Sequence, residues 1–268
     1  MWHSNRVPFL VAILTIGLAA CQPHRYEEAP LSPVKPHMNY AKAAELNIAL
    51  GLAYLKQGDV ERARDKLLRA SRLNPQNPEV YEALGVYYEH VRLLPRAEES
   101  YWKALSLAPE SAGANYHFGA YLCHMQQYAK AEGYFQVALE DQHYPKIGEL
   151  LETAGVCAYQ AGNHVLAEAY LTRAVRESPK RTAPWLYAAR YAYINGDYDK
   201  AHEYIEHYSM LPHRPNPDML KLQFEIAEKS GDGVLAQASY QQLKTLFPNS
   251  SEWRAVMRAN LAKERNDD

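Results

Sequence analysis

The sequence predicts an all-α protein, a right-handed α-solenoid of six helical hairpins that ends in a C-terminal capping helix. A small residue recurs at intervals of 34 to 36 residues, and alanine recurs twelve residues after it. The first series is Gly51, Gly85, Gly119, Gly155 and Ala189, with Phe224 in sixth place, and the second is Ala63, Ala97, Ala131, Ala167, Ala201 and Ala236. Small residues let two helical backbones approach closely, and one hairpin cannot bury its apolar face alone. The chain is therefore expected to form one stacked array.

Glycine and proline mark the ends of the expected helices. Glycine followed by Asp or Asn ends one helix in the left-handed conformation and caps the next. This pair occurs at Gly58-Asp59, Gly162-Asn163, Gly196-Asp197 and Gly231-Asp232. A proline disfavours helical geometry in the residue before it, so one proline per unit closes each second helix. These prolines are Pro75, Pro109, Pro145, Pro179, Pro212 and Pro248.

Residues 78–111 show the repeating pattern most fully. Tyr81, Leu84 and Tyr88 share one face of the first helix, and Gly85 and Ala97 allow the second helix to approach it. This spacing resembles the tetratricopeptide repeat. The resemblance places six repeats at residues 44–77, 78–111, 112–147, 148–181, 182–216 and 217–250, within a domain spanning 44–268. Residues 251–265, with Trp253, Val256, Met257 and Leu261 on one face, are expected to form the capping helix.

The N-terminus predicts export and lipidation. Residues 1–20 combine Arg6 with an apolar run too short to span a bilayer, which is typical of a signal peptide. Leu18-Ala19-Ala20-Cys21 resembles a bacterial lipobox, so Cys21 is the expected acylated residue. Gln22 resembles the outer-membrane sorting pattern, which predicts a lipid anchor on the periplasmic face, and the proline-rich residues 21–43 read as a tether. The alternative is an ordinary signal peptide in which Cys21 is incidental.

Composition and motifs argue against several classes of function. The formal charge is -2 and no basic stretch is concentrated in the sequence, so no nucleic-acid partner is expected. The sequence has no phosphate-binding glycine loop and no nucleophile elbow, so we expect no enzyme, no cofactor and no small-molecule substrate. His117 and His124 share a helical face without a third ligand, which predicts no metal site. Glu79, Glu82 and Glu89 are expected to form a solvated acidic face.

Cys123 and Cys157 lie on the expected first helices of repeats three and four. In an exported protein these two residues could form a disulfide across the stacked helices. The alternative is a pair of small buried thiols.

In the tetratricopeptide architecture, four positions of each first helix face the concave surface. Carried onto this chain, they imply an apolar and aromatic floor with acidic flanks, which suits an amphipathic helix or an extended peptide with basic residues. The predicted partner-binding residues are Leu52, Leu55, Val86, Glu89, Asn115, Tyr116, Ala120, Val156 and Tyr159. About half of the aromatic residues are expected to pack between repeats instead.

Repeats three and four carry more specific features, namely Asn115-Tyr116, Gly119, Tyr121-Leu122-Cys123, Ala138-Leu139, Tyr144-Pro145 and Ala154-Gly155 with Cys157. With the lipobox and the six repeats, they resemble the PilF/PilW family of outer-membrane lipoproteins, the pilotins of type IV pilus biogenesis. The resemblance implies binding of the pilus secretin subunit, its outer-membrane localisation and multimer assembly, and support of twitching motility. It also implies the Cys123–Cys157 disulfide. Arg92-Leu93 departs from the usual glycine turn.

A second reading belongs to a different class of function. The chain could be a periplasmic repeat-scaffold lipoprotein of envelope assembly, an adaptor for outer-membrane protein insertion or for peptidoglycan enzymes. Neighbouring cell-wall genes would favour this reading over the pilotin.

Overall fold

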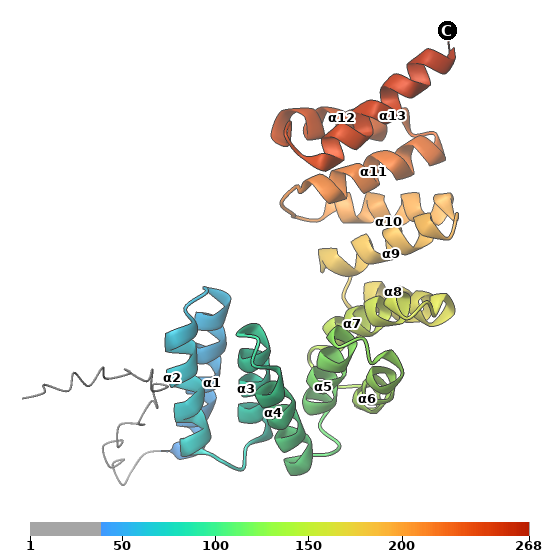
Figure 1. Cartoon of the computed structure of the whole chain (residues 1–268). Helices are drawn as coiled ribbons and strands as arrows, with labels where there is room; N and C mark the ends of the chain where they lie inside the picture. Colours follow the sequence, from blue (N-terminus) through green and yellow to red (C-terminus); the bar gives the residue numbers. More distant parts are fainter. Residues whose placement is uncertain (1–38, 268) are drawn as a thin grey trace, which may run out of the picture. The chain divides into compact units, whose positions relative to one another are not determined.

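The computed structural model describes residues 39–267, which form one compact unit of thirteen helices and no strands (Figure 1). Twelve helices form six antiparallel pairs, one pair per repeat, and the thirteenth follows them. The helices are α1 Tyr40–Lys56, α2 Val60–Leu73, α3 Pro78–His90, α4 Leu94–Leu107, α5 Ala112–His124, α6 Tyr128–Glu140, α7 Ile147–Gln160, α8 His164–Glu177, α9 Thr182–Ile194, α10 Tyr198–Met210, α11 Pro217–Ser230, α12 Gly233–Leu246 and α13 Ser251–Asp267. The predicted all-α solenoid is confirmed.

The N-terminal boundary differs from the expected one. The Asn39 side chain accepts a hydrogen bond from the Lys42 amide and caps α1, which starts at Tyr40 instead of residue 44. Residues 40–43 are thus helical and not part of a tether. The predicted signal peptide, Cys21 and most of the tether lie outside the described residues. None of the helices between Tyr40 and Asp267 has the length and apolarity needed to cross a bilayer.

The four glycine turns adopt the predicted geometry. Gly58, Gly162, Gly196 and Gly231 have φ values of 80°, 76°, 80° and 81°. The Asp or Asn that follows each glycine accepts a backbone amide hydrogen bond from the first turn of the next helix. A Cβ atom added at Gly58 would meet nothing within 4 Å, so glycine is needed there for its backbone conformation alone.

Repeats two and three make the same turn without glycine. Arg92 and Gln126 take the left-handed conformation, with φ values of 62° and 59°. The residues that follow, Leu93 and Gln127, form no side-chain cap. A non-glycine residue in this region costs about 1–2 kcal/mol. The two strained turns lie side by side in the array, in consecutive repeats.

Proline closes five of the six second helices at the same distance. The helices α2, α4, α8, α10 and α12 each end two residues before their proline. The exception is α6, which ends at Glu140, five residues before Pro145. The two-residue insertion of repeat three falls in this connection, so a longer loop joins α6 to α7.

Small residues set the separation within each pair. A Cβ atom on Gly85 would lie 2.4 Å from Cε1 of Tyr101, whose side chain is 1% exposed. The tyrosine ring therefore occupies the space that glycine leaves open, which explains why the recurring glycine and the large residue of the second helix share one register. The alanines of the second series are buried throughout.

Consecutive repeats are joined by a recurring hydrogen bond. Tyr81 Oη, Asn115 Nδ2 and Trp185 Nε1 each donate to the carbonyl oxygen of a proline six residues earlier, at 3.0, 2.7 and 3.0 Å. All three residues occupy the fourth position of their repeat, so this bond ties the end of one repeat to the first helix of the next.

The last helix covers the end of the array. Val256 of α13 is buried, and the Trp253 ring packs edge-on against Tyr240 of α12, with 5.0 Å between the centroids. These contacts give α13 the role of the predicted capping helix.

Candidate functional site

The candidate site is a hollow on the first helices of repeats two and three. It has a volume of about 1130 Å³ and is lined by fourteen residues from α3 to α7. Three of the predicted groove residues, Val86, Glu89 and Ala120, line it. The helices α3, α5 and α7 carry five glutamates and no Lys or Arg. Of these glutamates only Glu89 lines the hollow, together with Arg92 and three histidines.

Glu89 is the best-defined polar group in this hollow. Its Oε2 accepts a hydrogen bond from Tyr101 Oη at 3.1 Å, and its Oε1 lies 2.5 Å from Nδ1 of His124. The hydrogen bond to Glu89 raises the pKa of His124 above its usual value. Tyr101 is buried and belongs to α4, the second helix of the repeat. Its hydroxyl group therefore holds the Glu89 carboxylate from the side of the protein interior. This geometry presents one oriented carboxylate to the hollow.

Glu82 forms a second glutamate–histidine pair two helical turns away from the first. Its Oε2 lies 3.9 Å from Nε2 of His117. Burial, followed by the charge of Glu79, raises the pKa of Glu82 to about 7. Burial, followed by the charge of Lys146, lowers the pKa of His117 to about 4. The pair is therefore not a permanent ion pair at neutral pH, because His117 is uncharged there.

The expectation of a solvated acidic face is wrong for Glu82, which is only 8% exposed. A Cβ atom on Gly113 would lie 2.9 Å from Glu82 Oε2, so it is this glycine that lets α5 close over the carboxyl group. Both histidine partners follow their glutamates by 35 residues, one repeat plus one position. That spacing was visible in the sequence and could have identified the pairs.

A smaller apolar pocket lies between α7 and α9. Its volume is about 170 Å³, close to that of a cavity that holds a benzene ring. The predicted residues Val156 and Tyr159 line it with Gln160, Leu171, Tyr187, Arg190 and Tyr191. Gln160 also lines the hollow around Glu89, so the two spaces are neighbours along one surface.

The other predicted groove residues pack within the repeats. Leu55 is buried, and Leu52 packs against the core cluster that α1–α3 share. Asn115 is 2% exposed, and its amide donates to the carbonyl oxygens of Pro109 and Ser111. The Tyr116 ring contacts His117 and Tyr144, and its hydroxyl lies 3.4 Å from that of Thr153. These four side chains are held mainly by neighbours in the fold.

Cys123 of α5 and Cys157 of α7 form a disulfide, with 5.8 Å between their Cα atoms. Cys123 also lines the hollow around Glu89. The bond fixes α5 and α7 beside the place where the two spaces meet. The first helices that form this surface are thus covalently joined.

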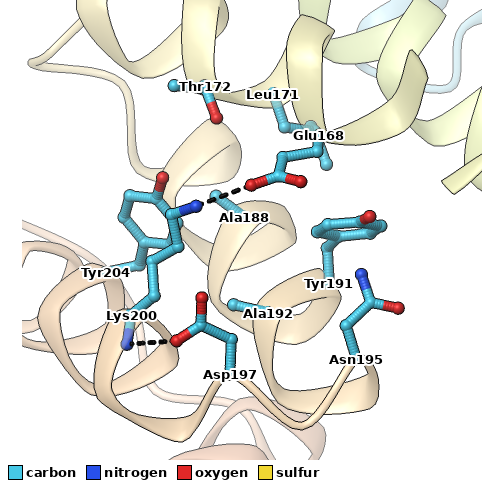
Figure 2. A pocket seen from close by; sticks show the side chains of 10 residues that line it. All are labelled: Glu168, Leu171, Thr172, Ala188, Tyr191, Ala192, Asn195, Asp197, Lys200 and Tyr204. Carbon is cyan, nitrogen blue, oxygen red and sulfur yellow. Dashed lines mark hydrogen bonds and ion pairs between the residues drawn. The ribbon is translucent and has the colours of Figure 1, made fainter. Parts of the chain in front are cut away.

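A third space lies behind the apolar pocket and is too small for a side chain of a partner. Figure 2 shows Tyr191 and Asn195 on one side of it and the Lys200 ammonium reaching Glu168, with 2.6 Å between Nζ and Oε1. Its volume is about 60 Å³. Tyr191 and Leu171 line both this space and the apolar pocket. The ion pair from α8 to α10 therefore fixes repeat five against repeat four behind that pocket.

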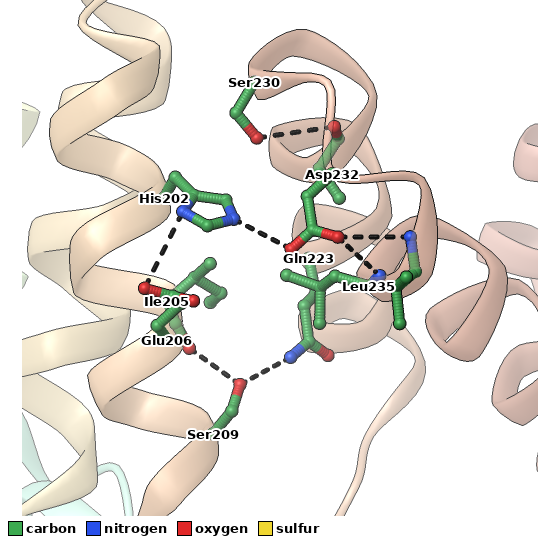
Figure 3. Close-up of polar contacts among 10 residues, drawn as sticks. His202, Ile205, Glu206, Ser209, Gln223, Ser230, Asp232 and Leu235 are labelled. Atoms are coloured by element: carbon green, nitrogen blue, oxygen red, sulfur yellow. Dashed lines mark hydrogen bonds and ion pairs between the residues drawn. The ribbon is translucent and has the colours of Figure 1, made fainter.

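A His–Glu–Asp cluster joins repeats five and six (Figure 3). His202 Nε2 lies 3.0 Å from Asp232 Oδ2, and Nδ1 lies 3.8 Å from Glu206 Oε2. No motif or spacing in the sequence predicts this group. The Asp232 carboxylate also accepts the amide hydrogens of Val234 and Leu235, and these bonds and His202 lower its pKa. Both imidazole nitrogens of His202 already face carboxylates. The cluster therefore serves as a polar contact that holds repeat five against repeat six.

Comparison with known proteins agrees with this architecture. Two family profiles match, one described as "TPR repeat" over residues 51–91 and one as "Tetratricopeptide repeat" over residues 124–182. Solved structures below 25% identity, such as the repeat protein YrrB at 20% identity and a TM-score of 0.56, share the fold. The chain is a tetratricopeptide-repeat protein.

Three full-length likenesses are more specific. The "Type IV pilus assembly protein PilF" of Pseudomonas aeruginosa is 26% identical over 245 residues, covering 91% of this chain and 95% of the relative. The solved structure of PilW, titled a "widely conserved type IV pilus biogenesis factor", is 28% identical with a TM-score of 0.71 and covers 80% of this chain and 98% of its own. The structure of Pseudomonas aeruginosa PilF gives 26% identity and a TM-score of 0.73, with coverage of 83% and 100%. The chain is a PilF/PilW-like tetratricopeptide-repeat protein.

Proposed function

We propose that this protein acts in type IV pilus biogenesis as a non-enzymatic scaffold that binds a segment of the pilus secretin subunit. The observation that carries the proposal is the likeness to PilF over 91% of this chain and 95% of the relative, together with the likeness to PilW over 80% of this chain. The hollow around Glu89 and the apolar pocket on the first helices supply a surface suited to a peptide segment. Bound there, the scaffold would bring secretin subunits to the outer membrane, promote their assembly into multimers and so support twitching motility.

The proposal includes a lipid anchor at Cys21 on the periplasmic face of the outer membrane. Its support is the lipobox pattern of the sequence, because Cys21 lies outside the described residues. Each buried methylene of an acyl chain contributes about 0.8 kcal/mol, so several chains would hold the protein on the membrane. The Cys21→Ala variant is expected to fold normally and to leave the outer-membrane fraction. Retention of that variant with the membrane would contradict the anchor.

Deletion of the gene tests the proposed function. We expect heat-stable secretin multimers to disappear from outer-membrane fractions, with loss of piliation and twitching, and to return on complementation. Unchanged multimers and normal piliation in the deletion strain would rule out the pilotin role. Defects in outer-membrane protein insertion or in the cell wall alone would favour the envelope-assembly adaptor.

The groove is tested with a matched pair of variants. Val156 lines the apolar pocket, whereas Val165 of α8 is 82% exposed and lines none of the spaces described above. Val156→Glu is expected to weaken secretin binding in a co-purification assay, and Val165→Glu to leave it unchanged, with similar melting curves for both. Equal loss of binding in the two variants would contradict a role for this pocket.

A further inference from the structure

We infer that the groove recognises its partner at two points: a Lys or Arg side chain that binds the Glu89 carboxylate, and an aromatic or branched apolar side chain that enters the pocket between α7 and α9. The inference rests on the proposed function for the identity of the partner, but the chemistry of the two points is defined by this chain. The occupant is one peptide segment, extended or helical, that passes Gln160.

The first point follows from charge. Glu89 is partly exposed, at 21% of its side chain, and lines the large hollow. Two other glutamates of the groove, Glu149 and Glu152, are already bonded to Arg181 at 2.9 and 3.0 Å. Among the described residues, Glu89 forms an ion pair with His124, whose side chain is 62% exposed and can be displaced, and Arg92 also lines this hollow. A carboxylate fixed by a buried tyrosine hydroxyl is complementary to a guanidinium or ammonium group.

The second point follows from shape and lining. The pocket of about 170 Å³ is formed almost entirely by Val156, Leu171 and the rings of three tyrosines. Tyr159 and Tyr191 meet edge to face, with 6.5 Å between the centroids. Arg190 at its edge is bonded to Asp218 at 2.6 Å, so its charge is already paired. An aromatic side chain can therefore enter without leaving a charge unpaired, and ring pairs prefer such edge contacts.

The two points belong to one surface. Gln160 at the end of α7 lines both spaces, and the Cys123–Cys157 disulfide fixes α5 to α7 beside it. A segment bound at Glu89 therefore reaches the apolar pocket by passing this glutamine. Because the walls are held by the disulfide and by the Lys200–Glu168 pair, little reorganisation is needed on binding.

A random 12-residue peptide library displayed on phage and selected on the full mature protein tests the inference without the secretin. We expect the selected peptides to combine a Lys or Arg with a Phe, Tyr, Trp or Leu at a fixed spacing. Two variants separate the points: Glu89→Gln keeps the size of the side chain and removes the charge, and Val156→Phe fills the pocket. Val165→Phe on the outer face of α8 is the matched control.

Each variant is expected to lose one preference only. Glu89→Gln should lower the affinity for a synthesised selected peptide about tenfold and abolish enrichment of basic residues. Val156→Phe should lower the affinity for the same peptide about tenfold and abolish enrichment of aromatic residues. Val165→Phe should change neither the affinity nor the enrichment. If Val156→Phe fails to fold, Tyr187→Ala, at a residue that is 37% exposed, replaces it and should reduce the aromatic preference. High salt should weaken only the Glu89 point.

Three results would overturn the inference. In the first, the selected peptides do not combine a basic residue with an aromatic or apolar one. In the second, they do, but neither Glu89→Gln nor Val156→Phe changes this preference. The third is a dimer in solution that Val156→Phe converts to a monomer, which would assign the pocket to a second copy of the chain. Secretin multimers in the deletion strain test the proposed function separately, so each can fail without the other.

Discussion

Glu82 is buried and His117 half-buried where α3 meets α5, and their pKa values move in opposite directions. Glu82 also faces Glu79, Lys146 and the Ser111 hydroxyl. A carboxyl group whose pKa is raised in the folded protein contributes stability below its unfolded pKa, near 4.5, and loses it as pH rises through about 7. A histidine with a lowered pKa instead loses stability as pH falls from about 6.5 to about 4. The two effects oppose each other between these limits.

Glu82→Gln isolates the first effect. A shift of about 2.5 pKa units corresponds to about 3 kcal/mol, so the variant is expected to be more stable than the wild type by up to this amount at pH 8 and nearly equal at pH 4. Urea denaturation at both values measures the difference. Glu110→Gln, at an exposed glutamate that does not contribute to the pKa shift of Glu82, is the control and should show little pH dependence. A Glu82→Gln difference that does not grow with pH would contradict the burial of a protonated carboxyl group.

His117→Gln isolates the second effect. Between pH 6.5 and pH 4 the wild type should lose stability relative to the variant, because the unfolded chain binds a proton there and the folded chain does not. Chemical denaturation across this range, together with the imidazole resonances of His117 followed by NMR, measures the effect. An imidazole that titrates near pH 6.5 in the folded protein would contradict the prediction.

Part of this site could be predicted at the residue level, and part could not. Val86, Glu89, Ala120, Val156 and Tyr159 line the two spaces because helical periodicity fixes which positions share a face. Asn115 and Glu82 escaped the pattern because their environment depends on the approach of a neighbouring repeat. The periodicity of one helix does not show how closely the next helix covers it.

At the level of the elements, the two turns without glycine are the main irregularity of the array. Arg92 and Gln126 keep the left-handed backbone that glycine adopts in four other turns. Both residues border the hollow around Glu89. Strained backbone is often retained near functional sites, and here a long side chain reaches the groove at the cost of local stability.

Arg92→Gly and Gln126→Gly are each expected to raise the free energy of unfolding by about 1 kcal/mol, because glycine removes the strain of the positive φ. Gly58→Ala should lower it by a similar amount, since nothing crowds a Cβ atom at Gly58 and only the backbone conformation opposes the change. Denaturation midpoints measure all three variants. If Gln126→Gly is instead less stable than the wild type, the contacts of the Gln126 side chain contribute more free energy than the strained backbone costs.

Gly85→Ala tests the close approach of α3 and α4. The added Cβ atom would overlap the buried Tyr101 ring, so the variant should lose about 1–3 kcal/mol. Ala substitution at Gly133, where a Cβ atom meets nothing within 4 Å, is the control and should be neutral or slightly stabilising. Thermal melting followed by circular dichroism distinguishes them. Equal melting temperatures for Gly85→Ala and the wild type would contradict the tight contact.

Helix existence and pairing could be predicted because the repeat fixes them, whereas two boundaries could not. The start of α1 at Tyr40 depends on the cap made by Asn39, which the proline-rich composition around it concealed. The early end of α6 depends on how the inserted residues are divided between helix and loop. In both places the local sequence, and not the repeat, decides the geometry.

For the whole array, the buried residues form one large apolar cluster from Ala97 to Val256, a second from Ala44 to Tyr87, and a small third of Ala112, Ala138 and Leu150. Tyr81, Val86 and Tyr88 pack against the first two clusters. The stack is thus continuous through repeat two. Stability in such an array is a sum of repeat and interface contributions, so a covalent bond between two repeats acts on the whole.

Replacing both cysteines of the disulfide by serine is expected to lower the free energy of unfolding by about 4 kcal/mol, on the chain-entropy estimate for a loop of 34 residues. Wild-type protein treated with a reductant should show the same loss, and the double variant should not respond to the reductant. Urea denaturation with and without reductant makes the comparison. A wild-type curve that the reductant leaves unchanged would contradict the contribution of the bond.

The position of the disulfide in the stack has a consequence for how the protein comes apart. A linear array frays from its ends, because a terminal repeat has a neighbour on one side only. The bond between α5 and α7 lies near the middle of the array. Unfolding that starts at α1 or at α13 therefore reaches the crosslinked repeats before it can spread through the whole array. A protease would therefore trim the protein inward from both termini and leave repeats three and four as the last resistant fragment, with α5 and α7 still joined but without the Glu89 of α3 and the tyrosines of α9 that complete the proposed binding surface.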